Sequence, residues 1–261
     1  MPSLQPFHVI IPARYASSRL FGKALADING KPMLQHVYER ALASNATSVT
    51  IATDDDRIAK AAENFNAKVC MTSTEHSCGT SRIVEAIITL NFPDDAIIVN
   101  VQGDEPLIPP VIIQQVAENL ATRPNMQAAT LCLPIENTKE LFDPNVVKVV
   151  TDNFGAALYF SRAPIPWERD NFSTKNNNLT DTTLSSIHYR HIGIYAYRVG
   201  FLKKYATWLP CTLEESEKLE QLRILWNGCK IHVAVAKAVS PIGVDNLEDL
   251  EKVREILNSE L

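Results

Sequence analysis

The chain has 261 residues, of which 46% are hydrophobic and 21% are charged, and its formal net charge at pH 7 is −5. This composition is ordinary for a globular protein with a large core. The net negative charge argues against a general nucleic-acid binder or a binder of anionic membranes, so an anionic substrate would need a local cationic pocket or a bound metal. No apolar run approaches the ~18 residues that a membrane span needs, so we expect no membrane insertion.

The five cysteines stand at positions 70, 78, 132, 211 and 229 and form no C-x-x-C motif. Their odd number and spacing favour reduced thiols in a cytoplasmic protein over a disulfide framework or a zinc site. A basic stretch followed by a long apolar one does not occur at the start, so we expect no signal peptide.

The first predicted strand runs into a cationic loop. Residues 7–11 form a largely apolar run that ends in three β-branched residues and is followed by Pro12, which predicts a short buried strand. The next residues carry three cations, Arg14, Arg19 and Lys23. Open α/β sheets bind ligands outside the carboxyl ends of their strands, and these cations suit phosphate oxygens. The loop matches neither Walker A nor G-x-G-x-x-G, and a plain solvated basic loop remains the alternative.

Strands and helices are predicted to alternate through the first half of the chain. We expect helices over residues 33–43, 53–64, 83–90 and 110–121, and strands over residues 48–52, 68–71 and 96–101. This order predicts a mainly parallel sheet with right-handed crossovers. The aspartates at positions 54–56 favour capping of a helix over metal binding.

Two polar segments follow strands in this half. Residues 72–82 form a predicted ligand-edge loop that holds His76, more simply a hydrogen-bonded loop histidine, and ends with Arg82 at a helix start, where a cation is unfavourable. Residues 102–106, QGDEP, resemble a metal-carboxylate turn in which Asp104 suits Mg²⁺. A turn stabilised by an Asx hydrogen bond is the alternative.

Strands become denser in the second half, which predicts an antiparallel portion over the site or at an oligomer surface. The predicted strands cover residues 129–133, 146–151, 156–160, 191–197 and 230–236. We expect a mobile surface loop over residues 170–183, one helix over residues 214–226, and a last helix capped by Asp245 or Asn246. Three polar clusters in this half are candidate site residues: Arg162, Arg190 with His191, and Glu220 with Gln221. Salt bridges or positions at the edge of the core would also explain each of them.

Several runs, in order along nearly the whole chain, resemble the cytidylyltransferases that activate acidic sugars, and within them the CMP-Kdo synthetases (3-deoxy-manno-octulosonate cytidylyltransferases). These runs are IPARYASSRL, CMTS with GTSR, VNVQGDEPLIP, ALYFSRAPIPW, RHIGIYAYR, LEQLRILW, KIHVAVA and GVDNLEDLEKV. The resemblance implies one α/β nucleotidyltransferase domain over residues 1–261, with a Rossmann-like sheet and a smaller β-containing dimerisation portion. Its sub-regions would be a nucleotide-binding half (1–127), a sugar-binding and dimerisation portion (128–229) and a return to the core (230–261).

The resemblance also implies the chemistry, which is the Mg²⁺-dependent reaction of CTP with Kdo in lipopolysaccharide biosynthesis. Four residues would be catalytic: Arg14, Lys23, Asp104 and Asp245. The nucleotide would be held by Arg14, Arg19, Lys23, Met71 through its backbone, Arg82 and Gln102, and the metal by Asp104 and Asp245. The sugar would be held by Gln102, Arg162, His191, Tyr195, Glu220 and Gln221, with Arg162 as the partner of its carboxylate.

The chain departs from the family pattern in two loops. Phe21 and Ala24 stand where prolines are usual, and His76 to Arg82 reads HSCGTSR where HQSGTER is common, so Ser77, Cys78 and Ser81 differ. Two alternatives to Kdo activation follow. One is a cytidylyltransferase for another acidic sugar, such as a sialic acid, a pseudaminic acid or 8-amino-Kdo. The other is a nucleotide-binding protein without catalysis.

Overall fold

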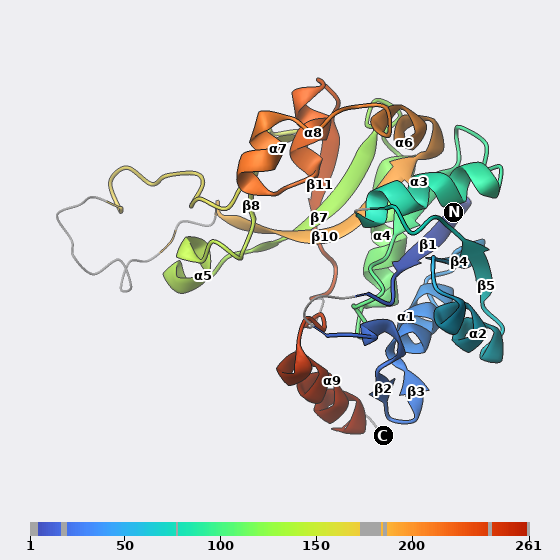
Figure 1. Ribbon diagram of the computed structural model, residues 1–261. Helices are drawn as coiled ribbons and strands as arrows, with labels where there is room; N and C mark the ends of the chain where they lie inside the picture. Colours follow the sequence, from blue (N-terminus) through green and yellow to red (C-terminus); the bar gives the residue numbers. More distant parts are fainter. Residues whose placement is uncertain are drawn as a thin grey trace.

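The computed structural model describes residues 5–16, 20–76, 78–172, 184, 187–239 and 242–259. Within them, a nine-stranded sheet carries a central run of strands in the order β11–β7–β10–β6–β1–β4–β5 (Figure 1). These strands are β1 (Phe7–Ala13), β4 (Ser48–Thr53), β5 (Lys68–Met71), β6 (Ile97–Asn100), β7 (Ala128–Pro134), β10 (Tyr189–Arg198) and β11 (Ile231–Val235). Neighbours along the run pair in parallel, except that β10 is antiparallel to both β6 and β7. The predicted mainly parallel sheet is confirmed.

The remaining strands of this sheet branch from β10. Strand β8 (Lys148–Thr151) pairs antiparallel with β10 and with β9 (Ala157–Ser161). The predicted antiparallel portion is therefore present, and β10 joins it to the parallel core.

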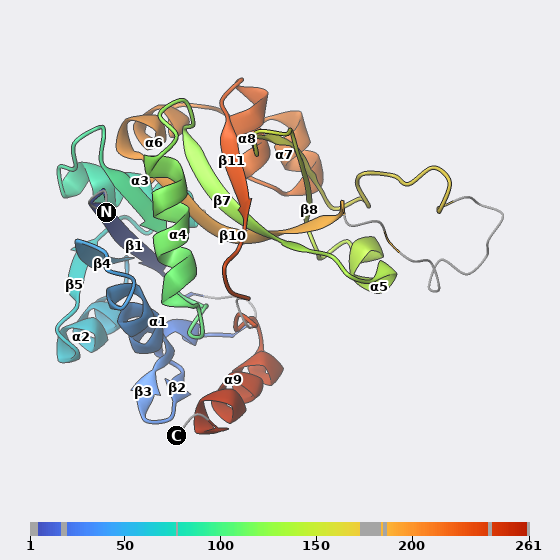
Figure 2. The same ribbon diagram turned by 180° about the vertical axis from the view of Figure 1, so that it is seen from behind.

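Helices cover both faces of the sheet and give three layers. Helices α1 (Met33–Leu42), α2 (Asp56–Asn64) and α4 (Pro110–Ala121) bury apolar side chains on one face, together with Val9 and Ile11. Helices α3 (Gly79–Thr89), α6 (Val199–Tyr205) and α8 (Gln221–Trp226) do so on the other face, with Ile10. Successive side chains of β1 therefore pack into the cores on opposite faces of the sheet, as expected for a strand buried on both faces. Helix α3 lies in front of the sheet in Figure 1, and α4 does so in Figure 2.

The C-terminal helix packs away from the sheet. Helix α9 (Leu247–Ser259) lies beside the hairpin of β2 (Asp27–Ile28) and β3 (Lys31–Pro32) (Figure 1). Leu250 and Val253 share a small apolar cluster with Ile28 and Met33. This packing fixes the segment before α9, which reaches the site described below.

Several predicted boundaries are wrong, and three of them have a clear physical cause. Strand β1 continues through Pro12 to Ala13, because its ladder with β6 ends at Ile10 and Pro12 has only β4 beside it. Helix α3 begins at Gly79, where Cys78 Sγ accepts the Ser81 N–H, so the last part of the predicted loop, residues 79–82, belongs to the helix. The predicted helix over 214–226 is two helices, α7 (Thr212–Glu217) and α8, separated at Lys218 by left-handed backbone with φ 55°.

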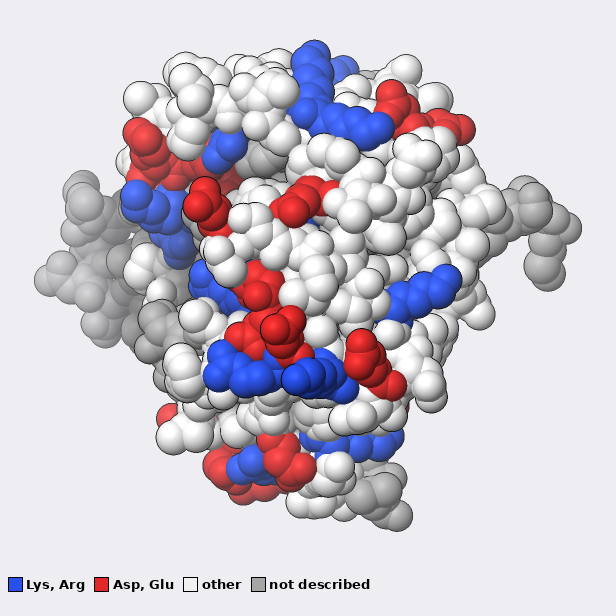
Figure 3. All heavy atoms as spheres, turned by 45° about the vertical axis from the view of Figure 1, so that its right-hand side comes forward, with Lys and Arg blue, Asp and Glu red and all other residues white. Residues whose placement is uncertain are grey.

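A short helix and the charged surface complete the fold. Helix α5 (Thr138–Phe142) places Leu141 against Ile135 and Phe172 in a separate apolar cluster. Most of the surface loop predicted over residues 170–183 lies outside the described residues. On the face shown in Figure 3, blue basic side chains and red acidic side chains are interspersed.

In the part of the chain that the structure describes, no helix is both long enough and apolar enough to span a bilayer.

Candidate active site

Two cavities adjoin at the carboxyl edge of the sheet. The first, named here the cation-lined cavity, has a volume of about 210 Å³, and its polar walls include Arg14, Lys23, His76, Arg82, Gln102 and Asp104. The second, the tyrosine-lined cavity, has a volume of about 320 Å³ and is lined by His191, Tyr195, Tyr197, Lys218, Glu220 and Gln221 among others. Gly79 and Gln102 line both cavities, so a group at Gln102 can face ligands on either side.

The close approach of two strand ends shapes the cation-lined cavity. The turn after β6 passes directly over the end of β1, and a Cβ atom added at Gly103 would lie 3.0 Å from the carbonyl oxygen of Pro12. A side chain at this position would push the turn away, so glycine permits the contact. Asp104 is thereby placed beside the loop that follows β1.

Lys23 joins three distant segments in this cavity. Its Nζ donates to Asp104 Oδ2 at 2.7 Å and to the carbonyl oxygen of Val244 at 2.8 Å, and it lies 3.5 Å from Asp245 Oδ1. Lys23 opens the 3₁₀ turn η1 (Lys23–Leu25), and the Val244 N–H in turn donates to the backbone oxygen of Asp104. The structure therefore brings together three of the predicted catalytic residues.

The cap of α9 fixes the position of Asp245. Asp249 Oδ2 accepts the backbone N–H groups of Asp245 and Asn246 at 3.0 and 3.2 Å, and Asn246 Oδ1 accepts the N–H of Asp249 at 3.0 Å. The predicted cap is thus confirmed at Asn246. Asp245 is left with its carboxylate directed to Lys23 from a rigid backbone.

The two carboxylates fit a hard divalent cation. Mg²⁺ in nucleotide sites takes one or two protein carboxylates and completes its shell with phosphate oxygens and water. Asp104 and Asp245 converge on a single ammonium group although they lie far apart in the sequence. Among the described residues, no group of three or more His, Cys, Asp or Glu side chains could hold a metal by itself. This donor set therefore suits a cation that is shared with a phosphate ligand.

Arg82 is a buried wall of the cation-lined cavity. It is 3% exposed, and its guanidinium donates to Asp54 Oδ2 at 2.8 Å and to Thr72 Oγ1 at 2.5 Å. Asp55 caps α2 by accepting the Arg57 N–H, so the predicted capping role of the aspartate run is confirmed there. These pairs hold the ends of β4 and β5 against α3.

The flank of this cavity holds a paired histidine. Glu85 Oε2 contacts His76 Nε2 and accepts the backbone N–H of Ser73 at 2.9 Å, and the hydrogen bond to His76 is the main cause of a lowered pKa of Glu85. Met71 ends β5, is 47% exposed, and does not line either cavity. Arg19 lies outside the described residues.

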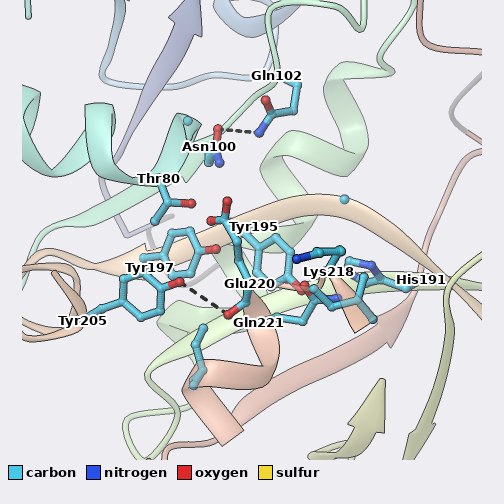
Figure 4. Close-up of a pocket in the computed structure, with 14 residues that line it drawn as sticks. Thr80, Asn100, Gln102, His191, Tyr195, Tyr197, Tyr205, Lys218, Glu220 and Gln221 are labelled. Atoms are coloured by element: carbon cyan, nitrogen blue, oxygen red, sulfur yellow. Dashed lines mark hydrogen bonds between the residues drawn. The ribbon is translucent and has the colours of Figure 1, made fainter. Parts of the chain in front are cut away.

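The antiparallel strand β10 supplies the wall of the tyrosine-lined cavity. Tyr195 lies opposite Asn100 at the end of β6, so the preceding half of β10 extends beyond the parallel strands. The pairing with β7 shifts register between Ile192 and Tyr195, and the intervening Gly193 lines the cavity. His191 and Tyr195 thereby face the same space (Figure 4).

Two buried polar atoms of this cavity lack partners among the described residues. They are the hydroxyl of Tyr195 and Nε2 of Gln221, and both side chains are at most 9% exposed. A buried polar group without a partner is unfavourable, so these atoms are suited to hydrogen bonding with a polar ligand. Burial raises the pKa of Tyr195 well above its ordinary value, so the hydroxyl stays protonated.

His191 is a neutral member of the same wall. Its Nε2 lies 3.0 Å from Thr130 Oγ1, and burial lowers its pKa to about 3. An imidazole with this pKa is uncharged at neutral pH, so it offers hydrogen bonds and not a positive charge.

Arg162 is engaged outside the cavity. Its Nε donates to the carbonyl oxygen of Glu217 at 2.7 Å and its Nη1 to that of Pro144 at 2.8 Å. The structure therefore does not bring Arg162 to the other residues predicted for the sugar, although His191, Tyr195, Glu220 and Gln221 do meet. The sequence reasoning missed Tyr197, Tyr205 and Lys218, which also line the cavity. The position of Lys218, two residues before Glu220, was the only signal for it.

A mainly parallel sheet with a cationic cavity at its carboxyl edge is typical of α/β proteins that bind nucleotides. Sequence comparison gives the family. The Cytidylyltransferase family profile matches residues 8–231. The chain belongs to the cytidylyltransferase family.

Individual relatives span almost the whole chain. The chain is 59% identical to a 3-deoxy-manno-octulosonate cytidylyltransferase of Histophilus somni (strain 2336), over 97% of this chain and 98% of that protein. It is 58% identical to the protein of the same name in Coxiella burnetii (strain RSA 493 / Nine Mile phase I), over 95% and 98%.

Solved structures agree with this assignment. A CMP:2-keto-3-deoxy-manno-octonic acid synthetase complexed with CTP superposes with a TM-score of 0.86 at 41% identity, covering 98% of this chain and 100% of that one. A cytidylyltransferase from Leptospira borgpetersenii serovar Hardjo-bovis has a TM-score of 0.63 at 17% identity over 98% of this chain and 89% of that one, and shares the fold.

Proposed function

We propose that this protein transfers CMP from CTP to 3-deoxy-manno-octulosonate (Kdo) and releases pyrophosphate, as the names of its relatives indicate. The observation that carries the proposal is the convergence of Lys23, Asp104 and Asp245 in a cavity that shares Gln102 with a second, hydrogen-bonding cavity. One cavity suits a polyphosphate, and the other suits a hydroxyl-rich molecule.

CTP would occupy the cation-lined cavity. Arg14, Arg19 and Lys23 would hold the triphosphate, because their charges neutralise its oxygens. The cytidine would lie toward Arg82, Gln102 and the backbone of Met71. In this arrangement the α-phosphorus lies near Gln102, at the boundary of the two cavities.

Asp104 and Asp245 would hold Mg²⁺ together with phosphate oxygens of CTP. When bound, this ion supplies positive charge that offsets the charge developing on the phosphates and increases the nucleophilicity of a sugar hydroxyl. With the two carboxylates engaged by the ion, Lys23 would donate to the triphosphate.

Kdo would occupy the tyrosine-lined cavity, with its hydroxyls hydrogen-bonded to His191, Tyr195, Glu220 and Gln221. Its anomeric hydroxyl oxygen would form a bond to the α-phosphorus of CTP and lose its proton to water, while the bond from that phosphorus to the bridging oxygen breaks and pyrophosphate leaves. The contribution of the chain is to position the two substrates and neutralise charge, as is usual in such transfers. His191 is a hydrogen-bonding residue here, because its low pKa makes it a weak base.

The cellular setting is also a proposal. The five cysteines are free thiols, which suits the cytoplasm, and the product would serve lipopolysaccharide biosynthesis. We further propose a homodimer in which the antiparallel portion around β8 and β9 takes part.

The test is pyrophosphate release with Mg²⁺ and Kdo, comparing CTP, UTP, ATP and GTP. Release with CTP alone is the expected result. Turnover of sialic acid, pseudaminic acid or 8-amino-Kdo in place of Kdo would reassign the substrate to another acidic sugar. CTP binding without release from any acidic sugar would indicate a non-catalytic protein.

A further inference from the structure

The tyrosine-lined cavity contains an unbalanced charge pattern. Its lining residues include one acidic side chain, that of Glu220, and one basic side chain, that of Lys218. The remaining titratable residues of the wall, namely His191 and the three tyrosines, are uncharged at neutral pH because burial shifts each pKa in the direction that favours the neutral form. An acidic sugar that enters this space meets a single group that can offset its negative charge.

Lys218 has an unusual backbone for a residue with a side chain. Its φ of 55° and ψ of 46° lie in the left-handed region, where glycine is the usual residue after the end of a helix. Such a conformation persists where the surroundings hold it, and it is often found at functional sites. The left-handed turn ends α7 and directs residues 218–221 into the cavity.

A hydrogen-bonded clamp holds this turn from behind. Glu217 Oε1 accepts the Ser161 hydroxyl at 2.6 Å, and its Oε2 accepts the Arg162 N–H at 2.9 Å. Nε of the Arg162 guanidinium donates a hydrogen bond to the carbonyl oxygen of Glu217 at 2.7 Å. The end of β9 thus fixes the residue directly before Lys218, and Arg162 acts on the cavity through that residue.

The ammonium group of Lys218 is available for a ligand. Among the described residues no ion-pair or hydrogen-bond partner is found for its side chain, in contrast to Lys23 and Lys148, whose amines are each held by two or more protein groups. Figure 4 shows Lys218 between His191 and Tyr195, on the wall of the cavity.

We infer that Lys218 binds the carboxylate of the acidic sugar, and that Ser161, Arg162 and Glu217 position it. This assignment rests on the proposed function and adds to it the residue that recognises the acid group. A charge-assisted hydrogen bond from an ammonium to a carboxylate is stronger than a neutral one, so it selects sugars that carry the acid.

The experiment compares Lys218→Met, Lys218→Arg and Lys218→Gly with the wild type, using Kdo and its carboxamide as sugar substrates. Lys218→Gly removes the charge and also suits the left-handed backbone, so it guards against loss of folding. Lys230→Met is the matched control, because Lys230 is an exposed lysine outside both cavities.

We expect Lys218→Met and Lys218→Gly to raise the KM for Kdo at least about tenfold, while the KM for CTP is unchanged. Lys218→Arg keeps the positive charge, so its KM for Kdo should stay close to that of the wild type. With the carboxamide, wild type and variants should have similar KM values, since the charge that Lys218 recognises is gone.

Three results would overturn the inference. The first is an unchanged KM for Kdo in both charge-removing variants. The second is an equal increase for Kdo and for its carboxamide, which would place Lys218 against another part of the sugar. The third is an absence of pyrophosphate release by the wild type, which would remove the proposed function and this assignment with it. The first two results would leave the proposed function intact.

Discussion

Lys23 donates a 2.7 Å hydrogen bond to Asp104, a residue 81 positions later in the chain, and lies between that carboxylate and Asp245. The ammonium group therefore stands where two carboxylates would otherwise repel each other. It thereby offsets part of the charge of the two carboxylates. With the carboxylates engaged by a divalent ion, Lys23 would also provide one cation for the triphosphate.

Asp104→Asn should reduce turnover at least about 100-fold, because one carboxylate of the proposed Mg²⁺ site is lost while the shape of the side chain is kept. The measurement is the rate of pyrophosphate release at increasing Mg²⁺ concentration. Asp94→Asn is the matched control, since Asp94 forms an exposed ion pair with Lys203 away from both cavities. Wild-type turnover of Asp104→Asn at saturating Mg²⁺ would exclude Asp104 from the mechanism.

Tyr195→Phe should stabilise the free protein and impair sugar binding. The variant removes a buried hydroxyl that lacks a partner among the described residues, so the free energy of unfolding should rise by about 1 kcal/mol. The KM for Kdo should increase, because the same hydroxyl is proposed to bind the sugar. Thermal unfolding and steady-state kinetics on one preparation test both effects. A less stable variant with an unchanged KM would show that the hydroxyl has a structural partner and no ligand.

Arg162→Met should raise the KM for Kdo about threefold to tenfold without changing the KM for CTP, because it loosens the clamp on Glu217. A double-mutant cycle distinguishes an indirect role of Arg162, through the clamp, from direct binding of the sugar by Arg162. If Arg162 acts by holding the turn that carries Lys218, then adding Arg162→Met to Lys218→Met should raise the KM for Kdo little beyond the value for Lys218→Met alone. Fully additive effects on the KM would favour direct contact between Arg162 and the sugar.

His232 should make the protein sensitive to acid. It is 3% exposed, and burial, followed by the charge of Arg123, lowers its pKa to about 4. Between pH 6.5 and pH 4 the unfolded chain binds a proton at this position and the folded chain does not. Stability therefore falls as the pH falls, by roughly 3 kcal/mol over that range from this residue.

The corresponding variant is His232→Gln, which should flatten the pH dependence of the free energy of unfolding between pH 6.5 and pH 4. Urea unfolding at several pH values measures it. His36→Gln is the control, because His36 lies on α1 and hydrogen-bonds to a carbonyl oxygen of the β2–β3 hairpin. An acid dependence of His232→Gln equal to that of the wild type would exclude His232 as its source.

The sequence predicted the elements whose boundaries are marked by strong local signals. Strand β5 and helix α4 begin and end where the pattern placed them, since β5 is a short apolar run and α4 opens with proline. The division of α7 from α8 was missed because Lys218, and not glycine, takes the left-handed position. Helix α3 begins earlier than predicted because a cysteine, an uncommon cap, accepts the N–H group of Ser81 in its first turn.

The sequence could also predict which polar side chains near strand ends belong to the candidate site. It could not predict the order of the strands in the sheet. The insertion of β10 between β6 and β7 sets His191 and Tyr195 beside Gln102, and this pairing depends on tertiary packing. Arg162 carries the expected charge, yet the carbonyl oxygens of Pro144 and Glu217 engage it. Local sequence gives the chemistry of a side chain, whereas its direction depends on neighbours far along the chain.

The bond from Lys23 to the carbonyl oxygen of Val244 spans 221 residues. A growing chain on the ribosome can form the early strands and their helices soon after synthesis, because those elements pair with one another. The paired carboxylates come together only after the last segment has emerged and docked. An incomplete chain would therefore fold much of its sheet and still be unable to turn over CTP. Activity would begin only when translation is almost finished.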